Sequence, residues 1–188
     1  MIENEIKKAI EILRKGGIIL YPTDTVWGLG CDATNEEAVA KIYAIKQRLD
    51  SKSMILLASD LDMVCRYTKE IPEIAVQLVE VNDKPMTIIY PGAMGLPKNV
   101  IAEDGTVGIR IPLKGFCKLL VKKLGRPLVS TSANISGQAS PRTYAEISEE
   151  IKSAVDYIVE PSFEKQSTRK PSSIIKVGVD YTIKVIRD

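Results

Sequence analysis

The chain contains no histidine. It therefore lacks the parts of a Ser-His-Asp or Cys-His arrangement, of a histidine-ligated zinc site and of an imidazole pH switch. Any catalysis has to come from Lys, Arg, Asp, Glu, Ser, Thr, backbone groups or a metal that a substrate brings with it.

Cysteine is also scarce. Cys31, Cys65 and Cys117 are odd in number, lie far apart and form no C-x-x-C pair. This pattern excludes a disulfide framework and a cysteine-rich zinc site, and it suits a reducing compartment. A catalytic thiol would lack its usual histidine base, so small buried apolar residues are the favoured interpretation.

Long hydrophobic runs are missing as well. No apolar stretch approaches the ~20 residues that a membrane-spanning helix needs. The charged residues 1–8 lack the apolar core of a signal peptide. We therefore expect a soluble, cytoplasmic protein that does not engage a membrane.

Charge is nearly balanced overall and uneven along the chain. The 26 Lys and Arg residues and 24 Asp and Glu residues give a net charge of +2 over 188 residues. Residues 1–94 carry 11 basic and 14 acidic side chains (net −3), and residues 95–188 carry 15 and 10 (net +5). A basic half permits a surface for phosphate or nucleic acid, and it also describes ordinary solvated charge. The length fits a single domain spanning 1–188.

Hydrophobic periodicity predicts helices and strands that alternate through the chain. Capping boxes at Thr34-x-x-Glu37 and Thr143-x-x-Glu146 indicate two helix starts. The predicted helices are 2–13, 34–48, 60–66, 72–80, 115–124 and 143–153. The predicted strands are 18–21, 53–59, 86–90, 107–111, 128–131, 157–159, 173–177 and 182–186. This alternation is typical of an α/β domain with a mostly parallel or mixed sheet.

Three other stretches are predicted to be irregular. Residues 26–30 contain glycines where the backbone bends or lets a ligand approach. Residues 91–105 form a loop rich in Gly and Pro. The polar residues 161–171 are either a lid or a surface loop.

Two loops carry more hydroxyl, amide and glycine groups than connectors need. Residues 21–30 (YPTDTVWGLG) and 130–137 (STSANISG) each follow a predicted strand. Ligands of open α/β sheets bind outside the carboxyl ends of the strands, so both loops are placed to line a site. Ser, Asn and Gly also favour turns, which is the alternative interpretation.

Cationic residues form the second group of candidates. Lys46 and Arg48 end a predicted helix, where they either complement the helix dipole or clamp a polyphosphate, and Lys52 lies just beyond them. Arg110 stands in an otherwise apolar strand. It needs a carboxylate, supplied by the protein or by a substrate.

In combination these segments resemble the YrdC/TsaC family of threonylcarbamoyl-AMP synthases, in its short, single-domain form. The matching segments are 17–30 (GIILYPTDTVWGLG), Lys46-x-Arg48, 85–89 (PMTII), 106–112 (TVGIRIP), 127–137 (PLVSTSANISG) and 171–175 (PSSII). They occur in the family's order over nearly the whole chain. The resemblance implies a twisted, open mixed sheet with flanking helices and a cationic concave face.

The resemblance also implies an activity and a set of site residues. L-threonine, bicarbonate and ATP would give threonylcarbamoyl-AMP and pyrophosphate, and a partner transferase complex would pass the threonylcarbamoyl group to tRNA. The expected catalytic residues are Lys46, Arg48, Ser132 and Asn134, which also bind ATP together with Thr106 and Arg187. The expected threonine-binding residues are Thr23, Arg110, Ser130 and Ser172. Mg²⁺ would arrive with ATP, and no protein metal site is expected.

The sequence departs from the family pattern at three places. Leu49 follows Arg48 where the family usually has proline, and residues 52–54 lack a proline before the apolar run. Trp27 stands where Tyr or Phe is commoner. The first two departures concern the conformation of the loop after Arg48.

Two other functions are compatible with the same residues. One is a non-catalytic module that binds double-stranded RNA or tRNA through its cationic face, which the +5 half supports. The other is a carbamoyl-transfer domain related to those of hydrogenase maturation, which occur fused to other domains.

Overall fold

The computed structural model describes residues 1–47 and 54–188. The helices are α1 (Ile2–Arg14), α2 (Glu36–Ile45), α3 (Leu61–Tyr67), α4 (Glu73–Val81), α5 (Gly115–Leu124) and α6 (Glu149–Ser153). The strands are β1 (Ile19–Pro22), β2 (Trp27–Gly30), β3 (Ile55–Leu57), β4 (Met86–Tyr90), β5 (Val107–Arg110), β6 (Leu128–Val129), β7 (Thr131–Ser132), β8 (Tyr157–Ile158), β9 (Ser173–Val177) and β10 (Ile183–Arg187). The 3₁₀ turns are η1 (Lys98–Val100), η2 (Tyr144–Glu146) and η3 (Pro161–Gln166).

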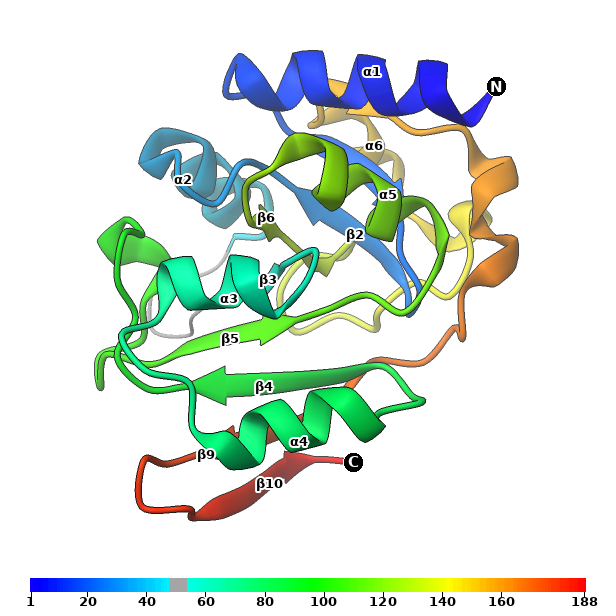
Figure 1. The fold of residues 1–188 in the computed structure, drawn as a ribbon. Coiled ribbons are helices and arrows are strands. Elements are labelled where there is room, and N and C mark those ends of the chain that lie inside the picture. The colour runs from blue at the N-terminus through cyan, green and yellow to red at the C-terminus, as the bar shows by residue number, and fades with distance from the viewer. Residues whose placement is uncertain (48–53) are drawn as a thin grey trace.

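The described residues form a mixed α/β fold with two sheets (Figure 1). The first has the strand order β7-β2-β1-β8, and the second has the order β10-β9-β4-β5-β3-β6. Both sheets mix parallel and antiparallel neighbours, as β1 shows by pairing antiparallel with β2 and parallel with β8. The predicted α/β class with flanking helices is confirmed, and the expected single sheet is replaced by two.

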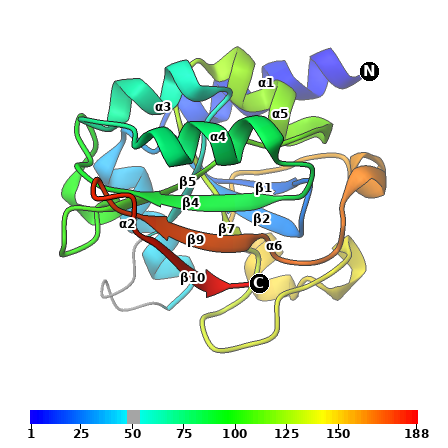
Figure 2. The ribbon, with the colours of Figure 1, turned by 60° about the horizontal axis from the view of Figure 1, so that its bottom comes forward.

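Helices pack against both sheets. α1 and α5 pack on each other and on β1. α3 and α4 lie along one face of the six-stranded sheet, as Figure 2 shows from below. The largest fully buried side chains are Trp27, Tyr21 and Tyr90, and they belong to one continuous apolar core. No helix in the described ranges is long and apolar enough to cross a membrane.

The two sheets separate at residue 130. The Val129 N–H donates to the Cys31 carbonyl (2.9 Å), and the Ser130 N–H donates to the Ile55 carbonyl (2.8 Å). β6 pairs with β3 of the second sheet, whereas β7, two residues later, pairs with β2 of the first. The predicted strand 128–131 is therefore two short strands in different sheets, and a space opens between them.

The first capping prediction is wrong by one residue. Asn35, not Thr34, caps α2, because its side chain accepts the Ala38 N–H at 3.0 Å. Thr34 instead donates its hydroxyl and its N–H to Asp32 Oδ1 (2.6 and 2.9 Å). The Asp32 carboxylate competes successfully for the Thr34 groups, which leaves the cap to the next polar side chain.

The second capping prediction is also wrong. The predicted helix 143–153 is the turn η2 followed by the short helix α6, which Ser148 caps through Ile151 N. Glu146 does not reach back to residue 143; its carboxylate accepts the Arg142 N–H at 2.7 Å. Helix α5, in contrast, has the predicted bounds, and Gly125 ends it in the left-handed conformation (φ +73°).

Two segments predicted to be irregular are ordered by pairing. Residues 27–30 form β2, an antiparallel partner of β1 with Gly28 opposite Tyr21. Residues 161–166 form η3, and the chain after it is tied to residues 24 and 25 by the bonds of Thr168 N to the Asp24 carbonyl and of the Ser167 hydroxyl to the Thr25 carbonyl.

Candidate active site

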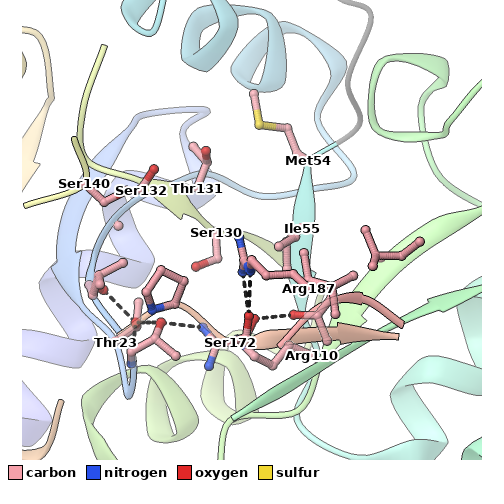
Figure 3. A pocket seen from close by; sticks show the side chains of 18 of the residues that line it. Thr23, Met54, Ile55, Arg110, Ser130, Thr131, Ser132, Ser140, Ser172 and Arg187 are labelled. Atoms are coloured by element: carbon pink, nitrogen blue, oxygen red, sulfur yellow. Dashed lines mark hydrogen bonds between the residues drawn. The ribbon is translucent and has the colours of Figure 1, made fainter. Parts of the chain in front are cut away.

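A cavity of about 710 Å³ lies between the two sheets. Its first wall carries hydroxyl groups from the turn after β1 and from residues 130–132. Its second wall carries arginine and hydroxyl groups from β4, β5, β10 and residue 172. Figure 3 shows these side chains converging. The polar and charged lining residues are Thr23, Thr25, Thr87, Arg110, Ser130, Thr131, Ser132, Ser140, Ser172 and Arg187.

Thr23 stabilises the turn that leads from β1 to β2. Its hydroxyl donates to the Val26 carbonyl (2.7 Å), so the contact with the Thr25 hydroxyl (2.9 Å) has Thr25 as the donor. Thr23 Oγ1 also accepts the Thr25 N–H at 3.0 Å. The turn is thereby rigid and presents its hydroxyl edge to the cavity.

Arg110 is buried at the end of β5 and pairs with the buried Asp24. Asp24 Oδ2 also accepts the Leu113 N–H (3.2 Å), and the Cys117 thiol lies 3.8 Å from Oδ1. The sequence left open whether a protein or a substrate carboxylate neutralises Arg110; the structure shows that Asp24 does. Arg110 nevertheless lines the cavity.

Ser172 links two strands of the second wall, β4 and β10. Its hydroxyl is 2.8 Å from that of Thr87 on β4. Its carbonyl accepts both Arg187 Nε (2.9 Å) and Nη2 (2.6 Å) from β10 (Figure 3). These two bonds hold the exposed Arg187 side chain at the cavity wall. Partial desolvation of the guanidinium lowers the pKa of Arg187 from its ordinary value.

Lys46 lies behind the first wall. It is 3% exposed, and Nζ donates to the carbonyls of Ser132 (2.6 Å) and Asn134 (2.7 Å). Asn134 donates Nδ2 to the carbonyls of Ile135 (3.0 Å) and Gln138 (2.8 Å). Its buried Oδ1 has no donor among the described residues. Neither Lys46 nor Asn134 lines the cavity, and Arg48 and Lys52 lie outside the described residues.

Thr106 is also absent from the cavity lining. Its hydroxyl donates to Asp104 Oδ1 at 2.6 Å. Hydrogen bonds from Lys176 and Thr106 lower the pKa of Asp104 to about 2. The structure thus brings together Thr23, Arg110, Ser130, Ser132, Ser172 and Arg187, and it places Thr106 in the turn before β5.

Sequence patterns do not single out every site residue. Asp24 lies in residues 21–30, the loop rich in hydroxyl and glycine groups, and the need of Arg110 for a carboxylate is the signal that points to it. Thr87 lies next to the buried Ile88 on β4, and neighbouring residues of a strand face opposite sides of the sheet. Thr87 therefore faces the side of the sheet that lines the cavity. No cluster of three metal-ligating His, Cys, Asp or Glu side chains occurs within 1–47 and 54–188.

Similar proteins share both the sequence and the fold. A protein named threonylcarbamoyl-AMP synthase from Pseudoalteromonas translucida (strain TAC 125) is 35% identical over 84% of this chain and 86% of its own. Another of that name, from Idiomarina loihiensis (strain ATCC BAA-735 / DSM 15497 / L2-TR), is 36% identical over 79% of this chain and 81% of its own.

Two solved structures extend the comparison. P. abyssi Sua5 complexed with L-threonine superposes with a TM-score of 0.83 at 28% identity, covering 92% of this chain and 50% of that one. The present chain therefore spans about half of that Sua5 chain. E. coli YciO superposes with a TM-score of 0.84 at 30% identity, covering 97% of this chain and 88% of that one.

A family model confirms the resemblance that the motifs indicate. The Sua5/YciO/YrdC model, described as "Telomere recombination", matches residues 11–188. The match includes every strand, every residue of the cavity lining and the motifs from residue 17 onward. By sequence and by fold, this chain is a member of the Sua5/YciO/YrdC family.

Proposed function

We propose that the protein is a threonylcarbamoyl-AMP synthase, an enzyme of the nucleotidyltransferase class. It condenses L-threonine, bicarbonate and ATP into threonylcarbamoyl-AMP and pyrophosphate. The relatives of that name cover most of this chain, and the Sua5 that holds L-threonine shares its fold. The observation that carries the proposal is the cavity, which unites two arginines with hydroxyl groups from both sheets.

The size and polarity of the cavity suit substrates that carry carboxylate, bicarbonate and phosphate groups. Its volume of about 710 Å³ falls within the roughly 300–1,000 Å³ range of ligand pockets. Arg110 and Arg187 supply cationic groups on the second wall. The hydroxyl groups can rotate, so they can donate hydrogen bonds to carboxylate or phosphate oxygens in different positions.

The chemistry requires alignment more than acid–base catalysis. The threonine amine adds to bicarbonate, which loses water and leaves a carbamate anion. A carbamate oxygen then attacks the α-phosphorus of ATP, and the bond to the β-phosphate oxygen breaks as pyrophosphate departs. The nucleophile is already anionic, so an enzyme without histidine only has to hold the reactants in line and stabilise charge.

The threonine carboxylate binds Arg110 in this proposal. Among the described residues, Asp24 and Thr25 accept hydrogen bonds from two of the five N–H groups of the Arg110 guanidinium. The remaining donors suit a carboxylate in the cavity. Thr23, Ser130 and Ser172 line the same cavity as Arg110 and complete the proposed threonine site.

The nucleotide binds along residues 130–134. Ser132 lines the cavity, and the buried Lys46 ammonium lies behind it and holds the Ser132 and Asn134 carbonyls. A positive charge at this depth also attracts phosphate oxygens. Arg187 extends the site from the second wall. The proposed ATP set also includes Asn134 and Thr106, which lie off the cavity lining, and Arg48, which lies outside the described residues.

Magnesium enters as part of the MgATP substrate. None of the described residues that line the cavity carries a carboxylate. Mg²⁺ bound to phosphates keeps several waters and needs few protein ligands. The product, a reactive mixed anhydride, passes to a cytoplasmic transferase complex that modifies tRNA.

The proposal is tested by measuring pyrophosphate release. The protein is incubated with MgATP, bicarbonate and single amino acids, and the adenylate is identified by mass spectrometry. We expect release with threonine and little with alanine or leucine. No release with threonine, together with tight binding of double-stranded RNA, would favour the non-catalytic RNA-binding module instead.

A further inference from the structure

One carboxylate oxygen joins three distant segments beside the cavity. Glu164 Oε2 on η3 accepts the Trp27 Nε1–H at 2.5 Å and the Tyr144 backbone N–H at 3.0 Å. Trp27 is on β2, and Tyr144 begins η2. Trp27 lies 137 positions from Glu164 in the sequence and Tyr144 lies 20 positions from it, yet both donate to the same Glu164 oxygen.

Ring contacts reinforce this junction. The Trp27 and Tyr144 rings lie 5.2 Å apart between centroids, at an angle of 50°. The Tyr144 ring also contacts Lys152, whose Nζ lies over the ring at 4.7 Å from its centroid. Trp27 is only 1% exposed, so its N–H needs an internal acceptor, and loss of that acceptor leaves a buried donor unpaired.

The junction holds the side of the cavity that the proposed function assigns to ATP. Trp27 itself lines the cavity. The segment of residues 132–144 carries Ser132, Asn134 and Ser140 before it reaches Tyr144. Ser132 and Ser140 line the cavity. Resting on the proposed function, we propose that Glu164 is a positioning residue that sets the ATP-binding wall through Trp27 and Tyr144.

The threonine side is fixed by other bonds. The Ser167 hydroxyl donates to the Thr25 carbonyl, and the Thr168 N–H donates to the Asp24 carbonyl at 2.9 Å. Asp24 in turn holds Arg110. Loss of the Glu164 carboxylate therefore leaves these contacts in place, and ATP binding changes more than threonine binding.

The chain offers a matched pair of variants. Both bonds end on the same oxygen, so Glu164→Gln can keep an acceptor there, whereas Glu164→Ala removes it. Trp27→Phe keeps a ring and deletes one donor. Glu11→Gln, on the exposed side of α1, is the control for loss of a negative charge.

The affinity for MgATP is measured by calorimetry without threonine, and the steady-state constants are measured separately. We expect Glu164→Ala to weaken MgATP binding about 10-fold, Trp27→Phe about 3-fold, and Glu164→Gln and Glu11→Gln less than 2-fold. The KM for threonine changes less than 2-fold in all of them. Equal loss for both substrates, or a fall in kcat alone, would overturn the positioning role.

Trp27 also reports on the junction directly, because it is the chain's single tryptophan. We expect its fluorescence to be poorly quenched by acrylamide in the natural protein and in Glu164→Gln, and at least 2-fold more quenched in Glu164→Ala. Unchanged quenching in Glu164→Ala would overturn the junction. A protein that shows these shifts in quenching and in MgATP affinity, but forms no adenylate, would contradict only the proposed function.

Discussion

At the scale of single residues, the pair formed by Asp24 and Arg110 shows what sequence can and cannot predict. A lone arginine in an apolar strand predicts a carboxylate partner from physical principles. The partner lies 86 residues away in the chain, and nothing local distinguishes Asp24 from other acidic residues. Lys46 shows the converse: its chemistry suits phosphate, yet its ammonium holds two carbonyls of the neighbouring loop.

Arg110 is expected to matter for both activity and stability. Arg110→Ala should lower threonine-dependent pyrophosphate release at least ~10²-fold, the effect of losing one transition-state donor. It also leaves Asp24 buried and unpaired, which costs about 3–5 kcal/mol of unfolding free energy. Urea denaturation measures this cost, and Asp24→Asn combined with Arg110→Met should restore more than half of it. Near-normal turnover in Arg110→Ala would contradict the carboxylate-binding role.

The three thiols should react very differently. Cys65 is exposed on α3, whereas Cys31 and Cys117 are buried. Burial, together with the nearby Asp24 carboxylate, raises the pKa of Cys117 to about 12, so its reactive thiolate is rare at neutral pH. Ellman's reagent should titrate about one thiol in the native protein and all three in urea. Rapid reaction of Cys117, identified by mass spectrometry of the labelled peptide, would show that the site around Asp24 opens to solvent.

At the scale of elements, local signals predict what local chemistry controls. The bounds of α5 and of β4 and β9 agree with the sequence prediction, since each has a clear apolar pattern and a glycine or proline nearby. β2 was missed because Trp-Gly-Leu-Gly reads as a turn, and its pairing with β1 decides otherwise. The division of 128–132 between two sheets depends on partners distant in the chain.

The corrected cap of α2 gives a direct test at this scale. Asn35→Ala should lower the unfolding free energy by about 1 kcal/mol, because the Ala38 N–H loses its acceptor. Asn35→Asp should retain most of the stability, since it keeps the oxygen and adds a favourable charge at the helix N-terminus. Chemical denaturation of the two variants separates these outcomes. Equal destabilisation by both would mean that Asn35 acts through packing instead.

At the scale of the whole molecule, the cavity results from topology. Two sheets diverge at residue 130, and each contributes one wall. The motifs predicted which segments carry polar groups, because a ligand site needs them. They did not predict that Lys46, Asn134 and Thr106 would lie off the lining, since burial depth depends on how the two sheets pack. The mild positive charge of residues 95–188 likewise does not locate the site, whereas the placement of Arg110 and Arg187 in the cavity wall does.

Because the walls belong to different sheets, substrates should stabilise the entire fold. A ligand at ~100 times its dissociation constant adds about 2.7 kcal/mol. For a chain of this size each kcal/mol raises Tm by about 2–4 °C. We expect MgATP at that concentration to raise Tm by about 5–10 °C, measured by scanning calorimetry.

The shift should be smaller in Arg187→Ala, which removes a cation from the second wall. It should stay intact in Glu11→Gln, whose change lies on the outer side of α1. Threonine added with a non-hydrolysable ATP analogue should raise Tm further, since it adds contacts with Arg110 and with the hydroxyls of both walls. A Tm that neither ligand moves would contradict substrate binding between the sheets, because any ligand that binds only the folded state shifts the unfolding equilibrium.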